Sequence, residues 1–219
     1  MKILCIDTST ECGTVAISRD GDVAGSVRWR SKGRHGENLL GYIESALSRA
    51  RVAPRELSAI GVVMGPGGFT SLRVGLATAK GLALGLDLPI VGVSSLRVMA
   101  RAIEASVDSA RVPVIKAYRG DIFAAAYVVR HGSLDEIVAP RSGNPADVLR
   151  GVRDAVGDRP ISVWSEGHVV TPEALAAEVH FVMQTQGPAD LAALEPQYLR
   201  SSDAKLPERR LRAKHTTKG

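Results

Sequence analysis

A glycine-rich turn between an apolar run and a helix of small residues constrains the fold more than any other feature. The turn, residues 65–73, reads GPGGFTSLR and follows the apolar run AIGVVM at 59–64. That run is typical of a buried strand, and the residues after the turn predict a helix over 70–86 with Thr70 or Ser71 as its N-cap. Glycines at such a junction let backbone amides approach a ligand or another chain closely.

The helix predicted over 70–86 is poor in large side chains on two sides. One row of small residues recurs every fourth position, and a second row lies beside it: Ser71, Gly75, Ala79 and Ala83, then Ala77, Gly81 and Gly85. Residues four positions apart lie on one face of a helix, so each row forms a bare surface. A surface of this kind favours packing at short range against another element or another chain.

The pattern of apolar residues predicts strands and helices in a mixed order. Expected strands cover 2–8, 13–18, 23–29, 59–64, 89–93, 112–118, 121–129 and 161–165. Expected helices cover 37–50, 70–86, 95–106, 145–156 and 172–183. Both halves of the chain begin with a strand hairpin and continue as strand–helix alternation, which indicates two α/β lobes. We expect an N-terminal lobe over 1–106, a smaller C-terminal lobe over 107–200 and a flexible basic tail over 201–219.

Composition excludes several classes of protein. With 219 residues, 45% of them apolar and 23% charged, the chain resembles an ordinary soluble globular protein. No apolar run reaches the roughly 18 residues of a membrane span. The first apolar stretch is too short for a signal peptide and is interrupted by Asp7, so we expect a cytoplasmic protein without membrane contact.

The excess of positive charge lies in the tail. Residues 205–219 carry six basic residues and one acid, which accounts for the net charge of +5 of the whole chain. Such a tail favours contact with RNA phosphates. The alternative is a solvated tail that only aids solubility, and it is favoured by the lack of aromatic residues for base stacking.

The cysteines and histidines do not predict a metal site or a disulfide. Cys5 and Cys12 fall on neighbouring strands of the first hairpin, where Cys5 is expected opposite about residue 15 rather than opposite Cys12. No two histidines have ligand spacing, and His35, which precedes the first helix, is expected to be a surface or capping residue. We therefore expect buried thiols and no metal ligands.

Asp7, Thr8 and Ser9 end the first strand and, with Gly67 and Gly68, are candidates for a vestigial phosphate loop. In actin-like and sugar-kinase-like ATPases an acidic residue at this place orders Mg²⁺ through water. The alternative is an aspartate that caps its own turn. The glycine-rich turn matches neither a Walker A motif, which needs a lysine, nor a dinucleotide fingerprint, since Thr70 occupies the place of the third glycine.

Six blocks of sequence together closely resemble the bacterial TsaB family, also called YeaZ-type. They are DTST at 7–10, ENLL at 37–40, GPGGFTSLRVG at 65–75, GLA at 81–83, GVSSL at 92–96 and EPQYLR at 195–200. The resemblance covers residues 1 to about 200 and implies the two-lobed actin-like and Hsp70-like (ASKHA) ATPase fold with a degenerate active site. It also implies a role in making the threonylcarbamoyladenosine (t6A) of tRNA.

The resemblance implies a scaffold rather than an enzyme, with no catalytic residue of its own. Its expected partners are the transferase TsaD, the ATPase TsaE, and tRNA through the complex. ATP and a metal ion are expected to serve those partner subunits, and no cofactor is expected for this chain. In the family the first two helices bind the partner, and here they correspond to 37–50 and 70–86.

The residues expected at the partner interface, or at a homodimer interface when the chain is alone, come from the apolar and small rows of these helices. They are Leu39, Leu40, Ile43, Leu47, Ser71, Leu72, Gly75, Leu76, Ala79 and Ala83. The alternative is that these faces pack on the chain's own sheet.

One position departs from the family pattern, because Lys116 stands where many relatives have an acid. Any role of that carboxylate is therefore in doubt here. Two other functions remain open: a phosphotransferase that uses Asp7 and the glycine-rich turn, and a peptidase. The peptidase has the weaker support, because the sequence shows no recognisable pairing of a nucleophile with a base.

Overall fold

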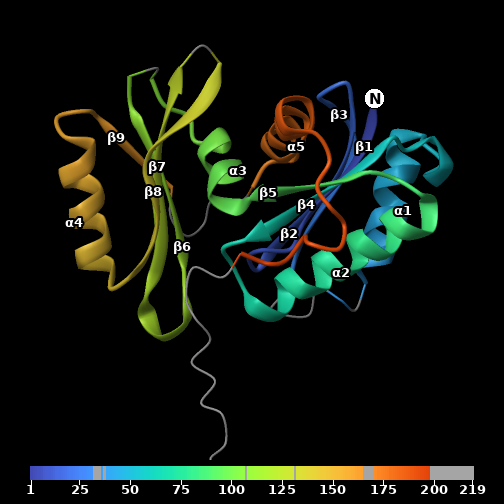
Figure 1. Cartoon of the computed structure of the whole chain (residues 1–219), viewed down its shortest axis with the longest axis horizontal. Coiled ribbons are helices and arrows are strands. Elements are labelled where there is room, and N and C mark those ends of the chain that lie inside the picture. The colour runs from blue at the N-terminus through green and yellow to red at the C-terminus, as the bar shows by residue number, and fades with distance from the viewer. Residues whose placement is uncertain (32–35, 37, 107, 131, 165–169, 198–219) are drawn as a thin grey trace, which may run out of the picture.

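The computed structural model describes residues 1–31, 36, 38–106, 108–130, 132–164 and 170–197. They form two sheets that lie side by side (Figure 1). The first sheet has the strand order β3-β2-β1-β4-β5. Its strands are β1 (Lys2–Asp7), β2 (Cys12–Arg19), β3 (Asp22–Arg30), β4 (Ala59–Gly65) and β5 (Ile90–Ser94). The first three form an antiparallel meander, and β4 and β5 run parallel to β1.

Helices cover both faces of the first sheet, because β1 is apolar on both sides. Leu4 and Ile6 point to α1 (Leu39–Ala50) and α2 (Phe69–Leu86). Ile3 and Cys5 point the other way, toward α3 (Ser95–Ala102) and α5 (Pro172–Gln186). Successive strand residues alternate between faces, so one apolar strand contributes to two cores.

The second sheet has the order β8-β7-β6-β9 and carries α4 (Pro145–Val156) on its outer side (Figure 1). Its strands are β6 (Ala110–Lys116), β7 (Ile122–Arg130), β8 (Ser133–Gly143) and β9 (Ile161–Trp164). The sequence did not predict β8, which is an edge strand and contains Pro140 and several charges. Edge strands tolerate such residues, so their sequences resemble loops. Short 3₁₀ turns occupy Pro54–Glu56 and Tyr118–Gly120.

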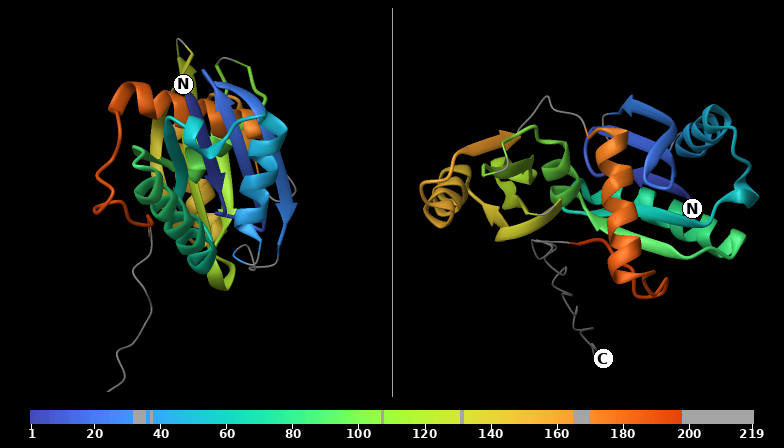
Figure 2. Two further views of the ribbon diagram at one scale, coloured as in Figure 1. Left: turned by 90° about the vertical axis from the view of Figure 1, so that its right-hand side faces the viewer. Right: turned by 90° about the horizontal axis from the view of Figure 1, so that it is seen from above.

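The chain returns to the first sheet after β9. Helix α5 lies across that sheet (Figure 2), and Gly61 leaves room for Val179, which a β-carbon at 61 would approach to 2.3 Å. Ala189 then forms a bridge with Ile90, and the Gln197 amide donates to the Met64 carbonyl. Residues 172–197, which the sequence analysis assigned to the second lobe, therefore lie against the first sheet.

Several expected helix ends differ from the structure, and α5 ends at Gln186 rather than at 183. Helix α2 begins at Phe69 with Gly68 as its N-cap, and the Ser71 hydroxyl donates to the Gly68 carbonyl instead of capping amides. The prediction of Thr70 or Ser71 as the cap was therefore wrong. Helix α3 ends at Ala102 rather than near 106. Among the described helices, none is long and apolar enough to cross a membrane.

Candidate functional site

Asp7 lies at the end of β1, beneath the surface of the first lobe. The Ser9 amide donates to its Oδ1 over 2.8 Å, so the carboxylate does cap its own turn. Its side chain is 0% exposed, and its Oδ2 has no hydrogen-bond partner among the described residues. Burial raises the pKa of the Asp7 carboxyl, and the hydrogen bonds from Ser9 only partly oppose this effect.

The glycine-rich turn lies directly on the Asp7 turn. The Gly68 amide donates to the Ser9 carbonyl over 2.9 Å. A β-carbon at Gly67 would lie 2.3 Å from the Ser9 carbonyl oxygen, so only glycine permits this approach. The Ser95 hydroxyl, at the start of α3, holds the Pro66 carbonyl from the other side.

The inner row of α2 completes this packing. The Thr8 hydroxyl donates to the Ser71 carbonyl over 2.7 Å. A β-carbon at Gly75 would lie 2.3 Å from Thr8 Oγ1, so the helix backbone lies against the turn that follows β1. The small row that begins at Ser71 therefore serves close packing of α2 on its own sheet.

The structure thus brings together the five candidates for a phosphate loop, but it fills the space between them with their own backbone. A carboxylate that orders Mg²⁺ must be reached by water on the metal, and Asp7 has no exposed surface. A phosphate cradle needs free amides, and the Gly68 amide is already bonded to Ser9. In this conformation the glycine-rich turn serves the packing of the fold rather than the binding of phosphate.

Nine of the ten residues expected at the partner interface are buried within this chain. They are Leu39, Ile43, Leu47, Ser71, Leu72, Gly75, Leu76, Ala79 and Ala83. Leu40 alone is exposed, at 59%. The apolar face of α1 and the first small row of α2 therefore pack on the first sheet, as the alternative interpretation expected, and whether α1 and α2 bind a partner stays a prediction.

A different set of residues forms the exposed outer face of α2. We define this outer face as Thr70, Arg73, Ala77, Gly81, Leu84 and Gly85, all exposed. Leu84 is 75% exposed, and a β-carbon at Gly81 or Gly85 would meet nothing within 4 Å. The sequence did contain the signal, because Ala77, Gly81 and Gly85 form the second small row, but nothing in it showed which row faces inward.

The remaining candidates give little further chemistry. Among the described residues, no three His, Cys, Asp or Glu side chains gather as a metal site would require. His35, together with His131, His168 and His215, lies outside the described residues. Lys116 ends β6 with an exposed side chain.

Comparison with known proteins finds relatives named for the threonylcarbamoyladenosine modification of tRNA. A family model described as TsaD: tRNA N6-adenosine threonylcarbamoyltransferase matches residues 29–186. The tRNA threonylcarbamoyladenosine biosynthesis protein TsaB of Bacillus subtilis is 30% identical over 93% of this chain and 96% of its own length. The TsaB protein of Escherichia coli is 35% identical over 58% of this chain and 55% of its own length.

Two solved structures have the same fold. A Pseudomonas aeruginosa protein described as similar to peptidase YeaZ superposes with a TM-score of 0.78 and 22% identity over 91% of this chain and 99% of that one. YeaZ of Pseudomonas aeruginosa superposes with a TM-score of 0.75 and 23% identity over 90% of this chain and 99% of that one. The expected α/β fold of the YeaZ type, with two sheets, is confirmed.

Proposed function

Because this chain belongs to the TsaB family of tRNA threonylcarbamoyladenosine biosynthesis proteins, we propose that it is a non-catalytic scaffold subunit of that modification machinery. It binds the transferase TsaD, and TsaE docks on the pair. It meets tRNA only through the complex, in the cytoplasm. ATP and the metal ion belong to the partner subunits, and this chain needs no cofactor.

The observation that carries the proposal is the closed site at Asp7. In the related ATPase folds this place would hold the chemistry. Here the carboxylate is fully buried, and the neighbouring glycine turn donates its own amide to Ser9. Burial raises the pKa of Asp7, which disfavours the charged form that a cation would need. The residues at this place therefore serve the packing of the chain itself rather than catalysis. This favours the proposal that the chain acts by binding a partner.

The outer face of α2 supplies a surface for a partner. Ala77, Gly81 and Gly85 have no bulk there, so the helix backbone is open to close approach by another helix. Leu84, at 75% exposure, adds an apolar side chain that gains by being covered. The same face suits a second copy of this chain when the transferase is absent.

Reconstitution of the reaction tests the non-catalytic role. Purified chain is combined with TsaD, TsaE, tRNA and threonylcarbamoyl-AMP, and t6A is measured. We expect no t6A from this chain alone and full formation in the complete mixture. An Asp7→Asn chain should support the same rate as the parent. Loss of t6A with Asp7→Asn, while the complex still forms, would show that the proposal is wrong.

One observation favours the phosphotransferase alternative: Asp7 Oδ2 is a buried oxygen without a partner among the described residues. Unpaired buried polar atoms often mark functional sites. Calorimetric titration of the isolated chain with Mg²⁺ and ATP distinguishes the two functions. Binding that Asp7→Asn abolishes would support the phosphotransferase, and the scaffold proposal predicts none.

A further inference from the structure

Helix α3 forms the joint between the two lobes (Figures 1 and 2). On one side it packs on β6, β7 and β8 of the second sheet. On the other side it packs on α5, which covers the first sheet. The contact between α3 and α5 is therefore a main place where the lobes meet.

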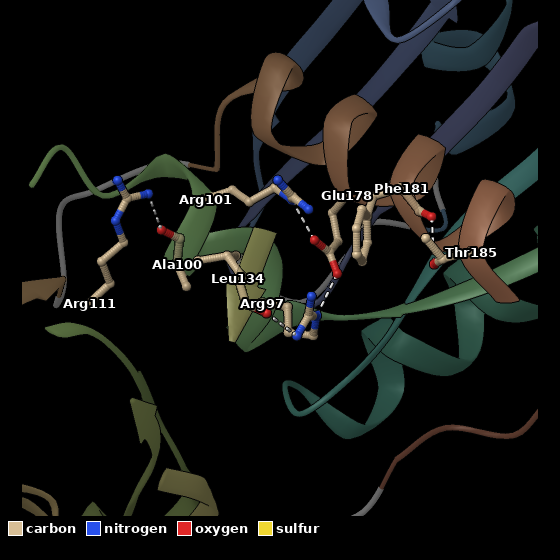
Figure 3. Close-up of polar contacts among 8 residues, drawn as sticks. All are labelled: Arg97, Ala100, Arg101, Arg111, Leu134, Glu178, Phe181 and Thr185. Carbon is tan, nitrogen blue, oxygen red and sulfur yellow. Dashed lines mark hydrogen bonds and ion pairs between the residues drawn. The ribbon is translucent and has the colours of Figure 1, made fainter. Parts of the chain in front are cut away.

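A single buried carboxylate joins these two helices (Figure 3). Glu178 of α5 is 0% exposed, and each of its oxygens accepts one hydrogen bond from α3. Arg97 Nε donates to Oε1 over 2.6 Å, and Arg101 Nε donates to Oε2 over 2.5 Å. The two arginines are one helical turn apart, so the carboxylate spans a whole turn of α3.

The same helix is tied to the second sheet by arginine–carbonyl bonds. Arg97 Nη1 donates to the Leu134 carbonyl of β8 over 3.2 Å. Arg111 of β6 donates to the Ala100 carbonyl over 3.2 Å, which satisfies a group in the last turn of α3 (Figure 3). Thus α3 is anchored to the second lobe. Glu178 adds a directional link to the first lobe, which α3 already joins through its start directly after β5 and its packing on β4 and β5.

The rest of the joint is apolar. Leu96 of α3 and Leu175 of α5 are both 0% exposed and belong to one core that reaches both sheets. The hydrophobic effect is not directional, so apolar burial alone specifies the register of two helices less sharply than hydrogen bonds do. Charge-assisted hydrogen bonds to two oxygens of one carboxylate are directional and tolerate little sliding.

We propose that Glu178, held by Arg97 and Arg101, sets the angle between the two lobes by fixing the register of α3 against α5. Replacing a buried ion network by apolar residues is often neutral or stabilising, which points to alignment rather than stability as its main effect. The inference concerns the isolated chain and does not depend on the proposed scaffold function.

The test measures the distance between the lobes in the full chain by pulsed electron resonance. Spin labels are placed at Arg55→Cys on the first lobe and at Leu149→Cys on α4, both exposed positions. Cys12→Ser removes the partly exposed native thiol, and Cys5 is buried. The parent is compared with Glu178→Gln and with the triple variant Arg97→Met, Glu178→Leu, Arg101→Met.

A control separates alignment from stability. Val179→Ala, next to Glu178 on α5, removes buried methyl groups and lowers the melting temperature without touching the network. We expect Val179→Ala to keep the narrow distance distribution of the parent. The triple variant should melt no lower than the control but show a broadened or shifted distribution, and Glu178→Gln should change it in the same direction.

The proposal is overturned by either of two results. One is a triple variant that is folded and keeps the parent distribution. The other is a Val179→Ala control whose distribution changes as much as that of the triple variant, since the distance would then follow stability alone. If the triple variant does not fold, Glu178→Gln at a temperature below its melting point decides between the same outcomes.

Discussion

The backbone amide of Gly68 donates a hydrogen bond to the carbonyl oxygen of Ser9 over 2.9 Å, and this bond joins the glycine-rich turn to the turn that follows Asp7. Two segments about 60 residues apart are thereby packed into one unit at the carboxyl ends of β1 and β4. Glycine at 67 makes the approach possible, because a β-carbon there would lie 2.3 Å from the Ser9 carbonyl oxygen. The most distinctive motif of the sequence therefore has a structural reason that is independent of ligand binding.

Asp7 should make stability depend on pH. Burial raises its folded-state pKa above the ordinary value of 3.8, so the folded state holds the proton more tightly than the unfolded state. Below 3.8 the aspartate is protonated in both states and has no effect on this balance. As pH rises from there through the folded-state pKa, stability is lost, by about 1.4 kcal/mol for each unit of the shift.

An Asp7→Asn variant isolates this effect, because asparagine cannot ionise and keeps an acceptor for the Ser9 amide. Urea unfolding from pH 4 to pH 8 should show the variant gaining stability relative to the parent as pH rises. The diagnostic quantity is the slope of the stability difference against pH, since the new amide group also changes the stability by an amount that does not depend on pH. A constant difference across this range would mean that the carboxyl does not titrate as its burial implies.

Two glycines of α2 should respond oppositely to the same substitution. Gly75→Ala places a β-carbon 2.3 Å from Thr8 Oγ1, and overpacking of this kind costs about 1–3 kcal/mol. Gly81→Ala meets nothing within 4 Å and should stabilise the helix by about 0.5–1 kcal/mol. Thermal unfolding of the two variants measures both effects. Destabilisation of equal size at both positions would contradict the assignment of Gly75 to the buried face of α2 and Gly81 to the exposed face.

The two cysteines should differ in reactivity. Burial raises the pKa of the Cys5 thiol to about 12, whereas Cys12 is partly exposed on β2. Because the thiolate is the reactive form, a thiol reagent should modify one cysteine of the native chain quickly. Cys12→Ser should abolish that fast phase, and unfolding should release the second thiol. Fast modification of both in the native state would contradict the burial of Cys5.

Much of the fold was predictable because its elements are locally regular. The first meander, the strand at 59–65 and the helices have clear apolar periodicity, and the hairpin places Cys5 opposite Ala16, one residue from the expected partner. The strand β8 was missed because Pro140 and the neighbouring charges resemble a loop. The position of α5 on the first sheet was not predictable, because its contacts there, such as that of Val179 over Gly61, join residues distant in sequence.

The candidate site, like the fold, was predictable from the sequence only in part. Sequence motifs brought Asp7 and the glycine-rich turn together correctly, yet only the structure shows that the turn closes on itself. On α2, two rows of small residues look equivalent in sequence, since neither carries charge in its centre. The close approach of Gly75 to Thr8 shows which row is buried, and the row containing Gly81 is left exposed.

The most direct test of the scaffold account measures complex formation between this chain and TsaD by size-exclusion chromatography with light scattering. Gly81→Arg and Leu84→Asp alter the outer face of α2, where both positions are exposed. Leu149→Asp alters an exposed leucine of α4 on the other lobe and serves as the matched control. Circular dichroism and thermal unfolding confirm that each variant is folded.

The account predicts a stable complex with the parent chain and with Leu149→Asp, and loss of the complex with both α2 variants. A complex that tolerates both Gly81→Arg and Leu84→Asp, or a parent chain that does not bind TsaD at all, would contradict it.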